Sequence, residues 1–172
     1  SDTLDLYQQT GLYKIQELPL EFSQPVIPTE IKNHSSLYSG AAGLLVSPLQ
    51  VAVMASTLSN GGHIVTPQIV TAYKPPEADW VLLDRGNDAG SVTEFDARLA
   101  AGMLTRGDFP GWEINSLAGY GDALIAWYMA GTPPDWEGTS LVVVAALEDG
   151  SVGESASIGK QVFLAATSGI MQ

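Results

Sequence analysis

Residues 40–62 read GAAGLLVSPLQVAVMASTLSNGG, and this stretch decides the fold of the chain. It predicts a loop that leads into a helix over about 48–60. Ser47 suits the N-cap of that helix, Pro48 suits the first helical position, where no N–H is needed, and Gln50 can complete a capping box. The glycines of Asn60-Gly61-Gly62 can take the left-handed conformation that ends a helix.

Nearly the whole circumference of this helix is apolar. Its few polar side chains are Gln50, Ser56, Thr57 and Ser59. A helix that is apolar on all sides is buried inside a larger body, because no face of it suits water. The stretch therefore predicts a central core helix.

Composition sets limits on the class of protein. The chain has 172 residues, enough for one domain with a sizeable core, and a net charge of −12 at pH 7. This acidity argues against nucleic acid or an anionic membrane as a partner, since both require a basic face. The chain has no cysteine, which excludes disulfides, thiolate metal sites and a cysteine nucleophile. No apolar run is long enough to span a membrane.

The first 39 residues predict a short helix followed by an irregular segment. Residues 3–10 resemble a helix with acidic residues in its first turn, and such a start within structure suggests a fragment of a larger protein. Residues 12–39 contain three prolines and predict an extended lead-in. After the central helix, residues 64–73 are β-rich, but Pro67 limits them to an edge or short strand. A linker follows from Lys74.

A second capping box, Ser91-Val92-Thr93-Glu94, predicts a helix over 91–105. An apolar stripe follows at helical spacing and consists of Val92, Phe95, Leu99 and Met103. This spacing predicts an amphipathic helix whose stripe lies on the core.

Three strands and a closing helix are predicted in the remaining third of the chain. The strands are expected over 114–119, 123–130 and 140–147. The last two are continuous apolar runs, typical of strands covered on both faces, and the turn at 131–135 favours an antiparallel pair. The closing helix is expected over 155–168, with Ile158, Val162, Ala165 and Ala166 facing inward. The predicted fold is α+β, a single domain with an antiparallel sheet flanked by helices.

The order of these motifs resembles the transpeptidase domain of penicillin-binding proteins. In that family a Gly-x-Gly loop leads into Thr-Pro-Leu-Gln and a helix ending in Asn-Gly-Gly, and the counterparts here are residues 40–43, 47–50 and 60–62. Residues 126–134, Ala-Trp-Tyr-Met-Ala-Gly-Thr-Pro-Pro, resemble the family's His-Ala-Trp-Phe-x-Gly-Tyr-Ala-Pro strand. Residues 7–12 resemble the end of a further family helix. The resemblance spans nearly the whole chain but only the C-terminal portion of the family's domain.

The motifs that perform the family's chemistry are absent from matching positions. The family acylates the serine of a Ser-x-x-Lys motif, and a Ser-x-Asn motif assists proton transfer; the resemblance implies that both would lie before Ser1. A Lys-Thr/Ser-Gly motif should precede the Trp127 strand. The chain has Gly119, Tyr120, Gly121 and Asp122 there, so a tyrosine replaces the lysine and Asp122 adds a negative charge. These four residues are the implied substrate-binding position, in degenerate form, and no catalytic residue is predicted.

Other candidate sites are weaker. Ser157-Ile158-Gly159-Lys160 matches Ser-x-x-Lys literally, but it lies in the closing helix on a face predicted to point to solvent. His34 and His63 lack the spacing of a zinc site and are predicted to be surface residues. Gly119-Tyr120-Gly121 lacks the third glycine of a phosphate-binding turn. The sequence therefore predicts no metal and no cofactor.

Three functional hypotheses follow. The first is part of a transpeptidase-like domain related to peptidoglycan synthesis, inactive in this chain and acting structurally or in partner binding. The second is a fragment of an active DD-transpeptidase, whose Ser-x-x-Lys and Ser-x-Asn would lie upstream of Ser1. The third is an unrelated α+β binding module, which a structure without the flanked three-stranded sheet would support.

Location and partners follow from the resemblance. The family implies an extracytoplasmic position in the cell envelope, with a membrane-anchored parent and no direct membrane contact by this chain. In the family, the strand that matches 140–147 pairs with a strand from the N-terminal portion. We therefore expect this apolar edge to be covered by residues 12–39, or by the remaining half of the domain or a second copy of the chain. Cell-envelope proteins or peptidoglycan are the wider expected partners.

Overall fold

The computed structural model describes residues 2–13, 23–26, 43–83, 92–120 and 122–170 of the chain. A three-stranded antiparallel sheet forms its centre, with strand order β3-β4-β5. The strands are β3 (Trp112–Tyr120), β4 (Ala123–Gly131) and β5 (Val142–Glu148). The predicted antiparallel pair is therefore confirmed, and the strand expected over 114–119 extends to nine residues.

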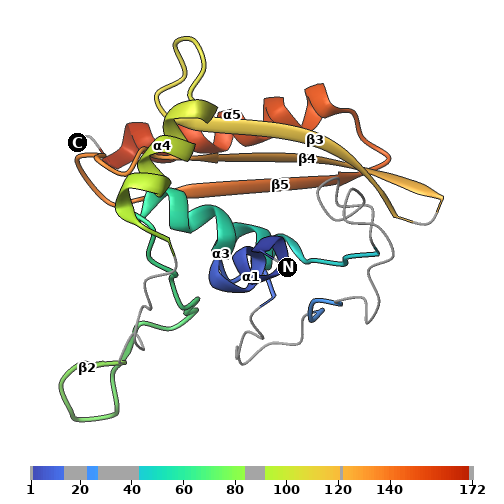
Figure 1. Ribbon diagram of the computed structural model, residues 1–172. Helices are drawn as coiled ribbons and strands as arrows, with labels where there is room; N and C mark the ends of the chain where they lie inside the picture. Colours follow the sequence, from blue (N-terminus) through green and yellow to red (C-terminus); the bar gives the residue numbers. More distant parts are fainter. Residues whose placement is uncertain (1, 14–22, 27–42, 84–91, 121, 171–172) are drawn as a thin grey trace.

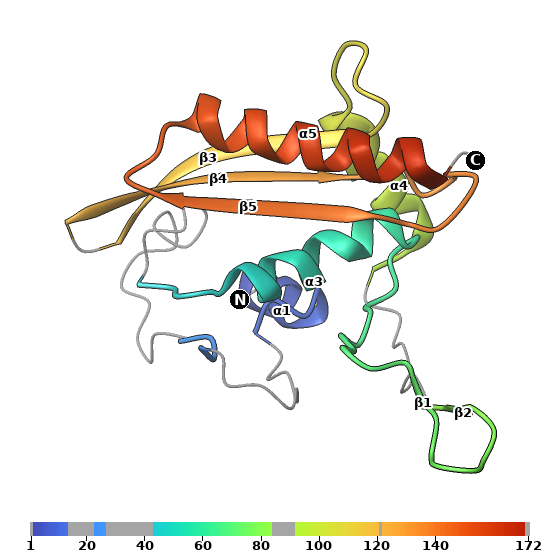
Figure 2. The same ribbon diagram turned by 180° about the vertical axis from the view of Figure 1, so that it is seen from behind.

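Helices cover both faces of the sheet. Figures 1 and 2 show α5 (Val152–Ile170) along one face, and α3 (Pro48–Ser59) and α1 (Asp2–Gln9) on the opposite side. The central strand β4 is consequently the most buried, and its residues Ala126, Tyr128 and Ala130 are at most 1% exposed. Continuous apolar sequence in β4 thus reflects cover on both faces, as predicted. The fold is α+β, and the structure has the flanked three-stranded sheet whose absence would have supported the third hypothesis.

The predicted central helix is α3, and its N-terminal cap has the expected geometry. The Ser47 hydroxyl accepts a hydrogen bond from the Gln50 backbone N–H, and the Gln50 side chain accepts one from the Ser47 N–H at 2.7 Å. Gln50 is fully buried, so the capping box also satisfies its side-chain oxygen inside the core, whereas its side-chain nitrogen has no partner among the described residues. The helix ends at Ser59, and Gly61 and Gly62 have positive φ angles, as the sequence predicts.

Helix α4 (Glu94–Leu104) differs from the prediction in two respects. Thr93 is its N-cap and bonds the Asp96 N–H, so the predicted capping box at Ser91–Glu94 is wrong; Ser91 itself lies outside the described residues. The buried residues are Ala97 and Ala101, whereas Phe95, Leu99 and Met103 of the predicted inward stripe are exposed and Val92 is half-buried. Small alanines let α4 approach α3 and β3 closely, where Ala101 packs with Ala55 and Trp112. The face of α4 that packs on its neighbours is therefore the alanine face, and not the face with the larger apolar side chains.

Helix α5 also presents a different face from the predicted one. Its buried residues are Ser155, Gly159, Phe163 and Thr167, spaced four apart, while Ile158, Val162 and Ala165 are exposed and Ala166 is only partly buried. Packing explains the choice, because Gly159 lies directly against the Tyr128 ring and leaves room for it. Phe163 fills the next position and contacts Phe109 at 4.9 Å between ring centroids. The face of α5 that points inward is thus the one whose side chains fit against β4, and not the one with the predicted apolar stripe.

The β-rich stretch 64–73 contributes only a short strand. β1 (Ala72–Tyr73) pairs antiparallel with β2 (Val81–Leu82), and the two form a small hairpin that stands away from the main body in Figure 1. Pro67 lies in the irregular approach to β1, consistent with a residue that cannot donate to a sheet. The predicted irregular lead-in over 12–39 falls mostly outside the described residues.

Candidate functional site

The residues predicted to bind substrate lie at the hairpin between β3 and β4. Gly119 and Tyr120 end β3 and pair with Leu124 and Ala123, while Asp122 is exposed in the turn. Gly121 lies outside the described residues. In both ribbon views this end of the hairpin extends beyond the helices, so the region is an exposed ribbon (Figures 1 and 2). These residues are therefore consecutive in one hairpin, and no enclosed site surrounds those of them that the structure describes.

Strand β3 has two halves with different surroundings. Trp112 at its start is 1% exposed and donates a hydrogen bond from Nε1 to the Ser59 Oγ of α3 at 3.0 Å. Residues 115–119 are exposed. The strand contains no lysine or arginine, and its one carboxylate is that of Glu113. The half that the prediction assigned to substrate thus offers neither a cation nor a buried environment.

A cluster of three side chains joins β3, β4 and α5. The Glu113 carboxylate accepts a hydrogen bond from the Tyr128 hydroxyl at 2.9 Å and forms an ion pair with Lys160 at 3.0 Å. The Lys160 ammonium also lies 5.7 Å from the centroid of the Phe109 ring. Burial of Tyr128, its hydrogen bond to Glu113 and the charge of that carboxylate all raise the pKa of Tyr128. The raised pKa keeps the Tyr128 phenol neutral at neutral pH, so its hydroxyl can donate to Glu113.

Sequence reasoning missed this cluster because no local spacing reveals it. In the sheet register Glu113 pairs with Ala130 and Tyr128 pairs with Asn115, so Glu113 and Tyr128 are diagonal neighbours on one face. Lys160 reaches Glu113 from α5, 47 positions away in sequence. Only the combination of strand register and helix placement brings the three groups together.

The literal Ser-x-x-Lys of α5 does not form a nucleophile and base pair. Ser157 is exposed, as predicted, and its Oγ accepts a hydrogen bond from the Gln161 side chain at 3.2 Å. Lys160 is only partly exposed and points toward β3, so the prediction that this face points to solvent is wrong for Lys160. Its ammonium lies 3.0 Å from the Glu113 carboxylate, and the Ser157 hydroxyl bonds Gln161, so the two residues do not form the pair that acyl-serine chemistry requires.

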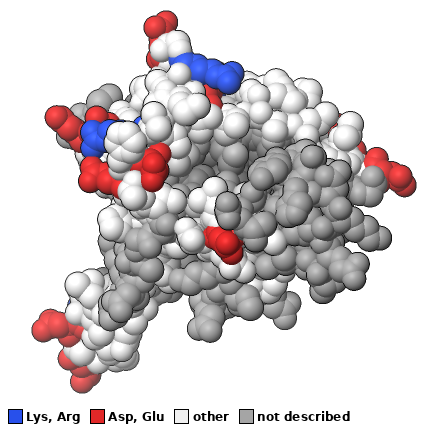
Figure 3. All heavy atoms as spheres, in the orientation of Figure 1, with Lys and Arg blue, Asp and Glu red and all other residues white. Residues whose placement is uncertain are grey.

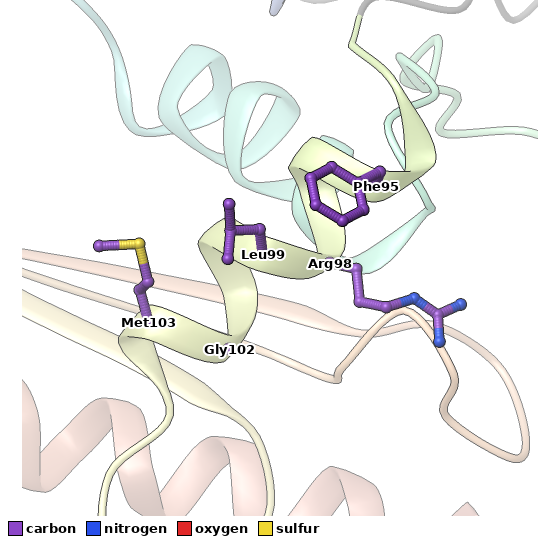
Figure 4. Close-up of a pocket in the computed structure, with 5 residues that line it drawn as sticks. All are labelled: Phe95, Arg98, Leu99, Gly102 and Met103. Atoms are coloured by element: carbon purple, nitrogen blue, oxygen red, sulfur yellow. The ribbon is translucent and has the colours of Figure 1, made fainter.

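The described residues offer no other obvious chemical centre. His63 is exposed, and His34 lies outside the described ranges. Groups of three or more potential metal ligands do not occur in the part of the chain that the structure describes. An open hollow of about 370 Å³ lies on α4 and is lined by Phe95, Arg98, Leu99, Gly102 and Met103 (Figure 4). Its lining is apolar apart from Arg98, so it suits packing more than catalysis.

Charge on the face shown in Figure 3 is sparse and mainly peripheral. Acidic side chains gather near the edges of the molecule, with a few basic ones beside them. This distribution agrees with the net charge of −12 and with the absence of a basic stripe expected for nucleic acid. No described helix has the length and apolar character needed to cross a membrane.

Comparison with known proteins provides the family. Residues 2–93 match the model of the penicillin binding protein transpeptidase domain. A comparison with curated protein sequences gave no match. The sequence match ends before α4 and the main sheet, so the rest of the chain is related to known proteins through its structure.

Several solved structures have the same fold. Penicillin-binding protein A from M. tuberculosis, solved as an imipenem acyl-enzyme complex, is 23% identical with a TM-score of 0.78 and covers 97% of this chain. Penicillin binding protein 3 from the same organism is 18% identical, with a TM-score of 0.69 and 85% of this chain covered. A peptidoglycan synthetase from Bifidobacterium adolescentis is 15% identical, with a TM-score of 0.68 and 96% covered. The chain spans 42%, 40% and 36% of these three structures, respectively.

Proposed function

This chain belongs to the penicillin-binding protein transpeptidase family, and we propose that it is a catalytically inactive part of a transpeptidase-like domain, acting structurally or in partner binding. The family relates the domain to peptidoglycan synthesis. The observation that carries the proposal is the chemistry of β3, which has one carboxylate and no cation.

The hairpin position disfavours the carboxylate substrate that the resemblance implies. Asp122 is exposed in the β3–β4 turn, and a second carboxylate held about 4 Å from it would meet a repulsion of roughly 1–4 kcal/mol, depending on the local dielectric. A lysine at Tyr120 would reverse the sign of this interaction. Residues 119–122 are therefore the degenerate remnant of a substrate-binding position in this proposal.

Lys160 does not replace the missing cation. It is the described lysine closest to β3, but its ammonium is paired with Glu113 at 3.0 Å, and Glu113 also binds the Tyr128 hydroxyl. To serve a substrate carboxylate, Lys160 would have to leave a partner whose side chain is only 15% exposed. Glu113 would then keep only the Tyr128 hydroxyl as a partner, and a mostly buried carboxylate left without its counter-charge is costly. The cluster acts as a link between α5 and the sheet.

The edge of β5 supports partner binding. Within the described residues β5 pairs only with β4, so its outer backbone groups face the open side of the sheet. On α5, Ile158 and Val162 lie about 200° around the helix from Lys160, which reaches β3, and so they lie toward the β5 side. Both side chains are exposed. An added strand would pair with β5 and cover them, and the remaining half of the domain is the proposed partner, with a second copy as the alternative.

The proposed location is extracytoplasmic, in the cell envelope where this family works, with the parent protein anchored in the membrane. Other cell-envelope proteins or peptidoglycan would then be accessible to the chain. The second functional hypothesis remains a proposal beside the first: the chain completes an active DD-transpeptidase whose acylated serine lies in the remaining portion of the domain.

Labelling with a fluorescent penicillin tests the proposal. The purified 172-residue chain is incubated with the reagent, denatured and resolved by electrophoresis, with an active transpeptidase as the positive control. We expect no covalent label on the chain. Stoichiometric labelling would overturn the inactive assignment, and mass spectrometry together with Ser157→Ala would show which serine reacts. Labelling only after addition of the remaining half, on a serine of that half, would establish the second hypothesis.

A further inference from the structure

The turn that ends α3 contains an asparagine followed by a glycine. Asn60-Gly61 is the only Asn-Gly pair in the sequence: Asn115 precedes a serine, and Asn33 and Asn87, which lie outside the described residues, precede a histidine and an aspartate. Asparagine is a thermolabile residue. The backbone nitrogen of the next residue can attack its side-chain carbonyl carbon, and glycine leaves that nitrogen unhindered because it has no Cβ. The sequence therefore singles out Asn60 for this reaction.

The attacking nitrogen is free in the structure. The Gly62 N–H donates to the Thr57 carbonyl at 2.7 Å, and the His63 N–H donates to the Asn60 carbonyl at 3.2 Å. Within the described part of the chain, the Gly61 N–H donates no hydrogen bond. Asn60 and Gly61 are only half-buried, so water reaches both of them. The turn thus offers a nucleophile, an amide and a source of water.

The native geometry limits when the reaction can occur. Asn60 has φ −111° and ψ 29°, which directs the Gly61 nitrogen away from the Asn60 side chain. Ring closure therefore requires rotation about the Cα–C bond of Asn60, which breaks the hydrogen bonds made by Gly62 and His63. The ends of helices are among the segments that open most readily in a folded protein. The reaction is consequently slower in the folded chain than in the unfolded one.

We propose that Asn60 is a deamidation site, which introduces a negative charge where α3 meets α4. The Gly61 nitrogen bonds to Cγ of Asn60 and the Cγ–Nδ2 bond breaks. The departing nitrogen takes the proton of the Gly61 amide and leaves as ammonia. Water then opens the resulting cyclic imide. Attack at Cγ gives aspartate, and attack at the backbone carbonyl carbon gives isoaspartate, whose main chain runs through the side chain and is longer by one carbon.

Both products place a carboxylate at the C-terminal end of α3. The helix dipole is negative at this end, so the new charge is unfavourable. The Glu94 side chain lies close by, since a Cβ at Gly61 would be 3.6 Å from its Cγ. Glu94 is exposed and already paired with Arg98, so its repulsion adds less than the dipole does. The Val92 N–H bonds the Gly62 carbonyl at 3.3 Å, so a disturbed turn also weakens the contact with the segment before α4.

Prolonged incubation of the purified chain at neutral pH tests the proposal. Peptide mass spectrometry should detect both aspartate and isoaspartate at position 60, while Asn115 stays unchanged. Asn60→Gln should abolish the conversion, because the longer side chain closes the imide ring poorly. Unfolding the chain in urea should speed the conversion of Asn60 about ten- to a thousandfold, since the turn no longer restrains its backbone.

Thermal denaturation tests the consequence for the fold. Asn60→Asp reproduces the aspartate product and should lower Tm by roughly 1–4 °C. Asn60→Gln keeps a neutral amide and should stay closer to the parent chain. Asn115→Asp, which adds the same charge at an exposed position of β3, should lower Tm less than Asn60→Asp does. Salt should narrow the difference between Asn60→Asp and Asn60→Gln, because it screens the dipole and Glu94.

Several outcomes would overturn the assignment. Asn115 could convert before Asn60, the folded chain could protect Asn60 by more than about a thousandfold relative to urea, or Asn60→Asp could match Asn60→Gln in Tm. Conversion to aspartate without isoaspartate would refute the cyclic imide. Circular dichroism of each variant separates a local effect from a loss of folding. None of these results depends on penicillin labelling, so the failure of this inference and the failure of the proposed function are distinguishable.

Discussion

Replacing Gly159 with alanine should destabilise the chain, although alanine normally improves a helix. Gly159 lies in the buried row of α5, and a Cβ there would overlap the Cδ1 and Cε1 atoms of Tyr128 and lie 3.0 Å from its Cγ. The Tyr128 ring cannot easily withdraw, since it is 1% exposed and its hydroxyl binds Glu113 at 2.9 Å. The clash must therefore be absorbed by moving α5 or by breaking that hydrogen bond.

The magnitude follows from three contributions. Overpacking a close-packed core costs about 1–3 kcal/mol, and loss of a hydrogen bond to a charged acceptor costs about 1.5–3 kcal/mol. The higher helix propensity of alanine offsets these by about 1 kcal/mol. The net loss for Gly159→Ala is about 0–2 kcal/mol if α5 moves and the hydrogen bond survives, and about 1.5–5 kcal/mol if the bond breaks. For a chain of this size each kcal/mol lowers Tm by about 2–4 °C.

Gly153→Ala provides the matched control within α5. A Cβ at Gly153 would meet only the Ser151 Oγ at 3.9 Å, so this change should be neutral or raise the free energy of unfolding by up to about 1 kcal/mol. Urea titration followed by circular dichroism measures both variants. If Gly159→Ala stabilised the chain as much as Gly153→Ala, the argument that Gly159 is required by the Tyr128 ring would be refuted.

Two further predictions concern the buried tyrosines. Glu113→Gln should cost about 1–2 kcal/mol, because it removes the ion pair with the partly exposed Lys160, and ultraviolet titration should show a lower pKa for Tyr128 once the carboxylate charge is gone. Burial, and to a lesser extent the charge of Tyr7, raises the pKa of Tyr13 to about 12. The unfolded chain therefore releases this proton first, so the free energy of unfolding is unaffected by Tyr13 titration below its ordinary value of 10.0 and falls as pH rises toward 12. Tyr13→Phe should reduce the loss of stability at alkaline pH. At pH 7 it should be neutral or stabilising by up to about 2 kcal/mol, because the buried hydroxyl has no hydrogen-bond partner within the described part of the chain. Denaturation measured against pH checks both, and a variant that loses more stability at alkaline pH than the parent chain would contradict this reasoning.

Elements with local signals could be predicted from the sequence. The cap of α3 depends on Ser47, Pro48 and Gln50, which lie within four positions, and the structure has this geometry. The β4 and β5 strands depend on continuous apolar runs and a turn, which are equally local. Contacts within a few residues of each other are fixed by backbone geometry, so a pattern can reveal them.

The orientation of helices on the sheet could not be predicted in this way. In both α4 and α5 an apolar stripe was expected to face inward, and in both most of that stripe lies outside, as Leu99 and Ile158 illustrate. Periodicity gives the spacing of a face, but the face that packs is chosen by fit to its neighbours. Small residues such as Ala101 and Gly159 permit the closest approach, and this preference depends on partners far away in sequence.

The separate halves of β3 explain how family membership and activity can diverge. At its start, Trp112 bonds Ser59 of α3, and a Cβ at Gly131 would lie 2.5 Å from the Trp112 ring, so each of these residues constrains the others. At its other end, residues 115–119 are exposed, and a Cβ at Gly119 would meet nothing within 4 Å. Substitutions there cost little stability, because surface changes away from packed contacts usually fall within about 0.5 kcal/mol. The packed half preserves the transpeptidase fold, while the exposed half can change with little loss of stability. In the proposed assignment Tyr120 stands in this exposed half in place of a cation, so the fold alone does not report activity, and acylation has to be measured.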